Sequence, residues 1–225
     1  MKIIVFAPHP DDEIYGCGGS IIKWMEEGHD VHIIYVSDNR ATRDWAKKGG
    51  KYIEDNEFKD HREEQMAEIG IKEAIEAAKF LGVPDENIHL FKFPDTKVED
   101  YVSDGVELSK LIVKDADRFV MPSDHNNHPD HQATHNIAKK VIQELNLKNL
   151  EIYIYCNYNP LKVPKEKLVK VRIGDLRHKI YDALQIYKSQ FVDEDMYQNS
   201  SAIKERRTER FGVFKFDDIE KYYNF

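Results

Sequence analysis

Cysteine is scarce in this chain of 225 residues, which contains only Cys17 and Cys156. Two cysteines form no disulfide framework, and such low usage suits a reducing compartment. Long apolar runs are also lacking, since none approaches the ~18 residues that a membrane span needs. No apolar leader precedes the first predicted strand. We therefore expect a cytoplasmic protein with no membrane partner.

Positive charge is in deficit as well, because 33 Lys and Arg residues face 41 Asp and Glu residues and give a net charge of −8. A nucleic-acid partner is not expected, since phosphate binding requires a basic surface. A length of 225 residues is enough for a substantial core that needs no disulfides. We expect one domain that spans residues 1–225.

Short apolar runs alternate with segments of helical spacing along most of the chain. The strand-like runs cover residues 3–6, 31–36, 88–91 and 119–121, and the helical spacing covers residues 21–25, 71–81, 106–113 and 137–145. Fully apolar runs are typical of strands that are buried on both faces. This alternation predicts an α/β fold with a Rossmann-like, doubly wound, mostly parallel sheet and helices on both faces.

The rest of the chain is less regular. Residues 40–60 break the helical pattern and predict a loop, which is locally basic and could contact substrate. Residues 152–156 and 169–173 alternate in polarity, which predicts strands with one face more exposed to solvent than the other. The apolar positions from Leu176 to Phe191 predict a final helix.

Ligand-type side chains follow two of the predicted strands. His9, Asp11 and Asp12 come directly after the first strand, and the segment from Ser123 to His131 follows the strand at residues 119–121. A polar turn that caps the next helix is the simpler interpretation of either group alone. However, the carboxyl ends of parallel strands meet at the sheet edge where ligands bind. We therefore expect the two groups to form one site.

The donor types in these groups indicate a divalent metal. His9, Asp12 and His131 supply two nitrogens and one oxygen, the count of a catalytic metal with an open position. Zinc fits this set, and Fe(II) or another divalent metal is an alternative. A bound metal lowers the pKa of water towards ~7, and Asp11 remains beside it as a candidate general base.

The remaining polar residues receive less specific predictions. Protonated His128 could stabilise an oxyanion or protonate a leaving amine, while Asp130 orients an imidazole. Substrate contacts are expected from the polar residues that follow the second strand, namely Asp38, Asn39 and Arg40. We expect His125 and His135 to be exposed to solvent.

These motifs resemble the LmbE-like (PIG-L) family of zinc-dependent de-N-acetylases. The resemblance rests on residues 8–13 with Gly18-Gly19 and on residues 128–131, with weaker support from residues 80–83, 188–191 and 209–211. It implies that His9, Asp12 and His131 bind zinc, that Asp11 is the base, and that His128 with Asp130 forms the acid or electrophilic pair. The implied substrate is a small N-acetylated amino sugar or its conjugate, and the resemblance allows a trimer or a hexamer while the pattern itself leaves the oligomeric state open.

One position departs from the family pattern. Aligned with Glu73 in the family's glutamate position, Gly70 stands where the family usually has an arginine that holds substrate. Arg62 or Lys72 could substitute for that cation, or the chain binds its substrate differently, or its activity is weakened. We expect Gly70→Arg to raise activity on a simple N-acetyl sugar if the position matters here.

Two alternatives to a deacetylase stay open from the sequence. An Fe(II) oxygenase is one, because His9, Asp11 and His131 formally match a facial triad. The alternation of strands and helices disfavours the all-β scaffold of such an enzyme. The other alternative is a sugar-binding protein of the same fold that has lost the chemistry.

Overall fold

A seven-stranded sheet forms the centre of the computed structural model, which describes residues 1–157 and 159–216. The strand order is β3-β2-β1-β4-β5-β7-β6. The strands are β1 (Lys2–Ala7), β2 (Asp30–Ser37), β3 (Ile88–Phe93), β4 (Arg118–Pro122), β5 (Glu151–Tyr155), β6 (Leu168–Arg172) and β7 (Thr208–Lys215). Pairing is parallel from β3 to β5, and only β7 runs antiparallel to its neighbours. The predicted mostly parallel sheet is confirmed.

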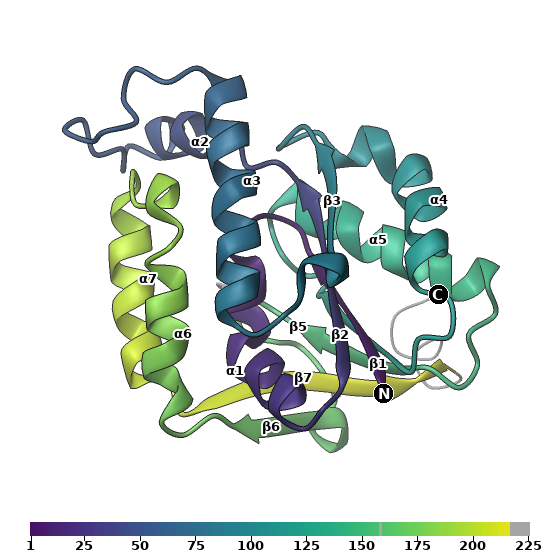
Figure 1. Ribbon diagram of the computed structural model, residues 1–225. Helices are drawn as coiled ribbons and strands as arrows, with labels where there is room; N and C mark the ends of the chain where they lie inside the picture. The colour runs from purple at the N-terminus through teal and green to yellow at the C-terminus, as the bar shows by residue number, and fades with distance from the viewer. Residues whose placement is uncertain (158, 217–225) are drawn as a thin grey trace.

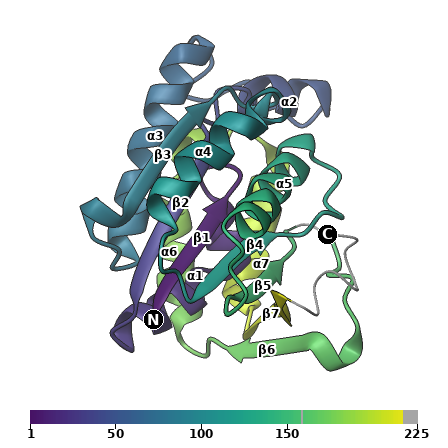
Figure 2. The same ribbon diagram turned by 90° about the vertical axis from the view of Figure 1, so that its right-hand side faces the viewer.

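Helices cover both faces of the sheet (Figure 1). They are α1 (Asp12–Glu26), α2 (Thr42–Lys48), α3 (Glu63–Phe80), α4 (Val102–Ile112), α5 (Pro129–Glu144), α6 (Leu176–Leu184) and α7 (Glu194–Glu205). Short 3₁₀ turns occupy Asp85–Asn87, Val98–Tyr101, Lys165–Lys167 and Lys188–Gln190. In Figure 2, α4 and α5 lie over the near face, while α1, α3, α6 and α7 lie on the other side. The predicted doubly wound α/β fold is confirmed.

The central strand β1 is buried on both faces, as its uninterrupted apolar sequence predicts. Ile3 and Val5 belong to the core cluster under α1, α3 and α6, whereas Ile4 and Phe6 belong to the cluster under α4 and α5. All four side chains have 0% exposure. Complete burial of such side chains is worth about 1.5–3 kcal/mol each, which fixes the position of the loop that follows β1.

The strand order reverses direction between β1 and β4. Their parallel pairing places Ala7 and Pro122, the last residues of these strands, at the same edge of the sheet. Connections from β1 and β4 leave to opposite faces, so a crevice opens between them, as it does at the switch point of other doubly wound sheets. Both predicted groups of ligand-type residues lie at this point, in the loops after β1 and β4 and in the first turns of α1 and α5.

Two glycines of α1 allow the helix to pack closely against neighbouring side chains. A Cβ atom at Gly16 would lie 2.5 Å from the Tyr155 ring, and one at Gly19 would lie 2.5 Å from Ile173. These separations are shorter than non-bonded carbon–carbon contacts in proteins. With a larger residue at either position, the helix could not approach its neighbours so closely. The glycine run after the His9 motif therefore brings α1 onto the sheet.

Helix α1 is broken at Cys17, whose φ of −154° and ψ of 20° are not helical. The backbone N–H of Gly19 donates to the buried Glu209 carboxylate at 2.7 Å, and Arg206 donates to the Tyr15 carbonyl. A helix end leaves such donors and acceptors unsatisfied, and residues from the β7 region supply the missing partners. This contact accounts for the Glu209 motif near the C-terminal end of the sequence.

Several local predictions were wrong. Residues 42–48 form the short helix α2, which buries only Ala46 and therefore shows no apolar period. The last predicted helix ends at Leu184 instead of continuing to Phe191. His135 is 2% exposed, and its Nδ1 lies 3.0 Å from the Pro122 carbonyl. His125 is exposed, as expected.

The sequence predicted neither α7 nor β7. Helix α7 buries only Met196, Ser200 and Ile203, so its apolar signal is weak. Strand β7 carries Glu209 at a buried position, which interrupts the expected apolar pattern. No helix among the described residues is long and apolar enough to cross a membrane.

Candidate active site

A cleft of about 650 Å³ opens at the carboxyl edge of the sheet, above the switch point. The loops after β1, β2, β3 and β4 all contribute side chains to it, and α2 and the segment before α7 form its outer wall. Its lining includes His9, Asp11, Asp12, Asn39, Trp45, Lys51, Asp95, Asn126, His128, His131 and Gln190. Five loops far apart in sequence therefore meet around one space.

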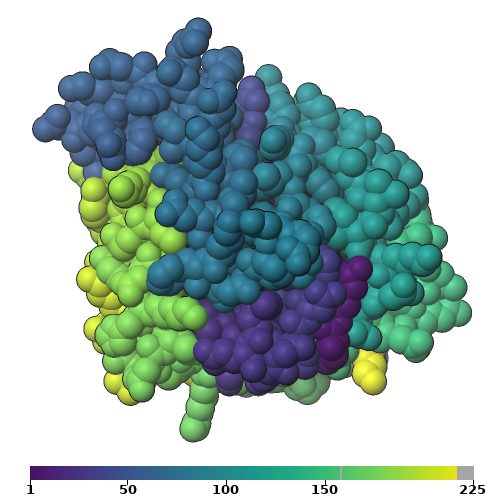
Figure 3. Space-filling model, viewed as in Figure 1, coloured from purple at the N-terminus to yellow at the C-terminus, as the bar shows by residue number. Residues whose placement is uncertain are grey.

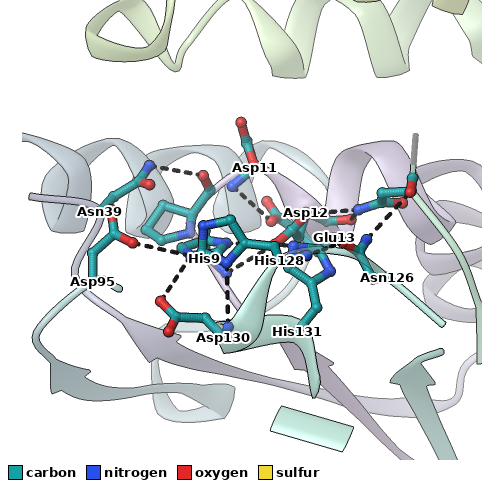
Figure 4. Close-up of polar contacts among 12 residues, drawn as sticks. His9, Asp11, Asp12, Glu13, Asn39, Asp95, Asn126, His128, Asp130 and His131 are labelled. Atoms are coloured by element: carbon teal, nitrogen blue, oxygen red, sulfur yellow. Dashed lines mark hydrogen bonds and ion pairs between the residues drawn. The ribbon is translucent and has the colours of Figure 1, made fainter. Parts of the chain in front are cut away.

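The three predicted metal ligands lie together at the base of this cleft (Figure 4). The Asp12 Oδ2 atom is 3.1 Å from His9 Nδ1 and 3.1 Å from His131 Nε2. One ligand atom from each residue lies within 4.8 Å of the other two. The second oxygen of Asp12 accepts a hydrogen bond of 2.6 Å from the Asn157 amide, which fixes the carboxylate. Two imidazole nitrogens and one carboxylate oxygen suit zinc, so the residues present fit a catalytic metal.

The protonation of the triad follows from its burial and its neighbours. Burial alone would raise the pKa of the Asp12 carboxyl, but His131 and His9 hold that pKa well below its usual range. Burial works against a charged His9, but Asp95, Asp12 and Asp130 raise the pKa of His9 well above its usual value. The cluster thus strongly favours positive charge at its centre.

The second nitrogen of His9 faces two further carboxylates. His9 Nε2 lies 3.1 Å from Asp130 Oδ2 and 3.2 Å from Asp95 Oδ1. Asp130 is held in place by the backbone N–H groups of Thr96 and Val98, at 2.7 and 3.2 Å. Because one nitrogen faces Asp12 and the other faces these acids, the carboxylates fix the orientation of the His9 ring.

His128 is connected to Asp130 through the backbone and not through the carboxylate. It caps the N-terminus of α5, where its Nδ1 accepts a hydrogen bond from the Asp130 N–H at 3.2 Å. Burial, together with His9 and His131, lowers the pKa of His128 to about 4. A neutral ring whose Nδ1 accepts a hydrogen bond must carry its own proton on Nε2. The His128 ring also packs against Trp45, with ring centroids 4.8 Å apart.

Asp11 lies between the predicted metal ligands His9 and Asp12 and lines the cleft. Its φ of 109° is unusual for a residue other than glycine, and its N–H donates to Glu13 at 3.1 Å. In Figure 4 the Asp11 side chain points upward, away from His9 and His131. Burial and the nearby carboxylates of Asp12 and Glu13 raise the pKa of Asp11 well above its usual range. A carboxyl group with such a pKa is suited to accept and return a proton.

Of the three residues that were predicted to contact substrate, only Asn39 lines the cleft. Asn39 lines the cleft, and its amide donates to the Pro10 carbonyl at 3.0 Å. Asp38 is 2% exposed and pairs with Arg40, whose Nη2 lies 2.6 Å from Asp38 Oδ2. Neither Asp38 nor Arg40 is among the residues that line the cleft. Their ion pair instead shapes the loop after β2.

Several lining residues were not among the predicted site residues. Asp95 follows β3 at the same sheet edge, so the rule that found His9 would have found it too. Trp45 and Lys51 come from the segment that was predicted to be a loop, and Gln190 comes from the turn after α6. Asn157 follows β5 and reaches Asp12. Amides and aromatic residues in loops carry no sequence signal of their own.

Gly70 packs helix α3 against the loop after β2. A Cβ atom at Gly70 would lie 3.2 Å from the Asn39 Cβ and 3.3 Å from the Asp38 carbonyl oxygen. Arg62 and Lys72 are exposed, and neither lines the cleft. In the part of the chain that the structure describes, Lys51 is the only lysine or arginine in the cleft lining. The close packing gives a physical reason for glycine at this position.

Helix α3 fixes the turn Lys188–Gln190, which lies at one side of the cleft. Glu73 accepts hydrogen bonds from the Ser189 N–H at 3.0 Å and from the Ser189 hydroxyl at 2.5 Å. The next residue, Gln190, accepts a hydrogen bond from Thr42 at 3.0 Å. Beyond it, Tyr52 pairs with Asp193, and Figure 3 shows the segment around residue 50 against the C-terminal part of the chain. These contacts close one side of the cleft.

The fold and the His/Asp centre define a member of a known family. The chain belongs to the PIG-L family, whose model, described as GlcNAc-PI de-N-acetylase, matches residues 4–142. The matched segment is more than half of the chain and contains both groups of ligand-type residues. The resemblance that the two motifs carry is therefore confirmed.

Curated relatives and solved structures agree with this assignment. A diacetylchitobiose deacetylase of Thermococcus kodakarensis is 29% identical over 135 residues, which cover 58% of this chain and 45% of that protein. A probable N-acetyl-alpha-D-glucosaminyl L-malate deacetylase 2 of Bacillus cereus is 28% identical over 135 residues, covering 58% and 56%. The aligned region spans about half the length of these relatives.

The fold is similar to that of the N,N'-diacetylchitobiose deacetylase from Pyrococcus horikoshii, with a TM-score of 0.75. That similarity covers 99% of this chain and 86% of the other, at 21% sequence identity. At such an identity the similarity concerns the fold, and the chemistry must be argued from the site itself.

Proposed function

We propose that this protein is a metal-dependent hydrolase that removes the acetyl group from an N-acetylated amino sugar or its conjugate. The observation that carries the proposal is the triad of His9, Asp12 and His131 at the base of a cleft that Asp11 and His128 also line. Family membership supports a de-N-acetylase reaction. The relatives named for N-acetyl sugar substrates support the substrate class.

His9, Asp12 and His131 would hold the metal. Zinc is the metal that best suits this donor set, and Fe(II) is a second possibility on coordination chemistry alone. When bound, such a metal polarises a carbonyl group and lowers the pKa of water towards ~7. Asp95 and Asp130 keep the His9 ring in the orientation that presents Nδ1 beside Asp12.

Asp11 acts as the general base in this proposal. It lines the cleft, and burial together with Asp12 and Glu13 raises the pKa of its carboxyl group. Asp11 accepts the proton of the attacking water and later returns it to the leaving amine. General base catalysis by a positioned carboxylate typically contributes about 10²–10⁴-fold to the rate.

His128 stabilises the negative charge that develops on the acetyl oxygen. Its Nδ1 accepts the Asp130 N–H, so the neutral ring offers Nε2–H as a donor. With a pKa of about 4, His128 stays neutral at physiological pH. In this proposal His128 therefore acts as a neutral hydrogen-bond donor to that oxygen.

The wall of the cleft suits a sugar. Trp45 is 52% exposed and lines the cleft beside His128, so its indole face is open to a ligand. The polar side chains of Asn39, Asn126 and Gln190 lie in the same lining. An aromatic face with a few amide groups around it binds a ring that has apolar faces and polar edges.

Acetate release from N-acetylglucosamine and its glycosides tests the proposal. We expect release by the zinc-loaded protein, loss after chelation and recovery when zinc is restored. Asp11→Asn should reduce the rate at least about 10²-fold while zinc stays bound. Asp104→Asn, at an exposed position of α4, is the matched control and should keep full activity.

Other outcomes would favour the alternatives. Oxygen consumption by the Fe(II)-loaded protein without acetate release would indicate an oxygenase. Zinc and sugar binding with no acetate release from any substrate would indicate a binding protein. Full activity of Asp11→Asn would remove Asp11 from the role of base.

A further inference from the structure

Asp11 has an uncommon backbone conformation at the start of α1. Its φ of 109° and ψ of −27° lie in a region that residues with a side chain rarely adopt. An aspartate directly before a helix usually has an extended backbone and caps the helix with its own carboxylate. Among the described residues of α1, none receives such a capping bond from the Asp11 side chain. The carboxylate is therefore left for the cleft, which it lines.

Glu13 accepts the hydrogen bond that supports this conformation. The Asp11 N–H donates to Glu13 Oε2 at 3.1 Å (Figure 4), and Glu13 has 0% exposure. On the carbonyl side, Asp11 accepts bonds from the N–H groups of Ile14 and Tyr15 at 2.9 and 3.2 Å. The cost of a strained backbone residue and the stabilisation from a hydrogen bond to a carboxylate are of similar size. The bond to Glu13 is thus strong enough to offset the strain at Asp11.

Two buried tyrosines fix the Glu13 side chain. The Tyr187 hydroxyl donates to the other carboxylate oxygen, Oε1, at 2.5 Å. The hydroxyls of Tyr187 and Tyr35 lie 3.4 Å apart, and Tyr35 donates to the Ala74 carbonyl at 3.3 Å. A buried carboxylate is stable only when its oxygens are bonded. Each oxygen of Glu13 therefore has a separate partner, Asp11 on one side and Tyr187 on the other.

The position of Tyr187 joins distant parts of the site. Tyr187 directly precedes the turn Lys188–Gln190, and it contacts Glu13 across 174 residues of sequence. Gln190 of that turn lines the cleft. Among the described residues, Glu13 and Tyr187 are not part of the cleft lining, whereas Asp11 is. Any influence of this pair on a bound substrate must therefore pass through Asp11.

We propose that Glu13 and Tyr187 are positioning residues that hold the Asp11 backbone so that its carboxylate serves the cleft instead of capping α1. Without them, Asp11 would relax to the extended backbone, and its carboxylate would bond the first N–H groups of the helix. The catalytic consequence rests on the proposed deacetylase function, in which Asp11 is the general base. The support of the Asp11 backbone does not depend on that function.

Tyr187→Phe tests the proposal because it removes one hydroxyl and keeps the ring. We expect kcat for acetate release from an N-acetylglucosamine glycoside to fall about tenfold, since a displacement of about 1 Å in a catalytic group costs up to about 10²-fold. KM and the zinc content should stay within about twofold, because the pair contacts neither substrate nor the proposed metal ligands. All rates are measured at a temperature where the variants are fully folded.

A double-mutant cycle with Asp11→Asn separates positioning from a general structural effect. Tyr187→Phe/Asp11→Asn should have the kcat of Asp11→Asn within about twofold, because the group that is positioned has already been removed. A structural effect that does not act through Asp11 would lower kcat by about another tenfold. Ile142→Val is the control for lost packing, since it lies in the other core cluster near the end of α5, and it should keep full activity.

Hydrogen exchange of the Asp11 amide, followed by NMR, keeps the test independent of turnover. Tyr187→Phe should speed this exchange about tenfold, because the acceptor of the Asp11 N–H is no longer fixed. The Gly19 amide, which donates to Glu209 at 2.7 Å in the same helix, should exchange as before. Faster exchange at Asp11 without acetate release by the unmodified protein would retain the support of Asp11 and reject the deacetylase. Unchanged exchange at Asp11, an unchanged kcat in Tyr187→Phe, or a further tenfold loss in the double variant would overturn the proposal.

Discussion

Glu73 is a buried acid on α3, and its protonation should make the stability of this protein depend on pH. The side chain is 8% exposed and accepts two hydrogen bonds from Ser189, at 3.0 and 2.5 Å. Burial raises the pKa of Glu73 from 4.5 to about 7, although the bonds from Ser189 work in the opposite direction. The unfolded chain keeps the ordinary value, so folding takes up a proton between these two pH values.

The direction and size of the effect follow from linkage. Because the folded-state pKa is the higher one, the stabilisation is complete below pH 4.5 and is lost as the pH rises through about 7. A shift of this size corresponds to on the order of 3 kcal/mol at 1.36 kcal/mol per unit. Glu73→Gln keeps an acceptor for the Ser189 N–H and cannot titrate, so it removes this contribution.

Urea unfolding followed by tryptophan fluorescence, at several values between pH 4.5 and 8, measures the difference. Relative to Glu73→Gln, the unmodified protein should lose on the order of 3 kcal/mol across this range. Taking the difference cancels other titrating groups, including the histidines of the site. Glu68→Gln, at an exposed position of the same helix, should run parallel to the unmodified protein. A constant difference between Glu73→Gln and the unmodified protein would refute the reasoning.

Further predictions concern three other positions. Trp45→Ala should raise KM for an N-acetyl glycoside about fivefold with little change in kcat, because an aromatic contact of about 1 kcal/mol is lost; unchanged KM would exclude Trp45 as a sugar contact. Tyr187→Phe removes the donor 2.5 Å from the buried Glu13 and should cost about 1–3 kcal/mol in urea unfolding, so full stability would contradict that bond. Gly70→Arg should destabilise the protein by about 1–3 kcal/mol by crowding Asn39 and lower its activity, and higher acetate release would instead support the opposite prediction made from the sequence.

Much of the fold was predictable because its signals are local. The runs 3–6 and 119–121 are continuously apolar, the run 31–36 is apolar except for His32, and β1, β2 and β4 are largely buried on both faces. Helix α2 could not be predicted because it buries one alanine. Strand β7 was missed because a buried carboxylate, Glu209, interrupts its pattern and is satisfied by α1, more than 180 residues away in sequence.

The residues of the site were likewise predictable only in part. His9, Asp12 and His131 were predicted from donor types after two strands, and the structure brings them together. The contacts of Asp38 and Arg40 were not predictable, because their ion pair forms within the loop and turns both side chains from the cleft. Sequence position gives the edge of the sheet but not the direction of each side chain.

The sequence by itself determined the family and predicted the candidate metal ligands, because the short motifs after β1 and β4 carry the donors in fixed order. Only the tertiary structure decided which partner each donor has. It placed the Asp130 carboxylate beside His9 and its N–H beside His128, and it brought Trp45 against the His128 ring. These contacts join segments far apart in the chain, and their geometry depends on packing that no local pattern records.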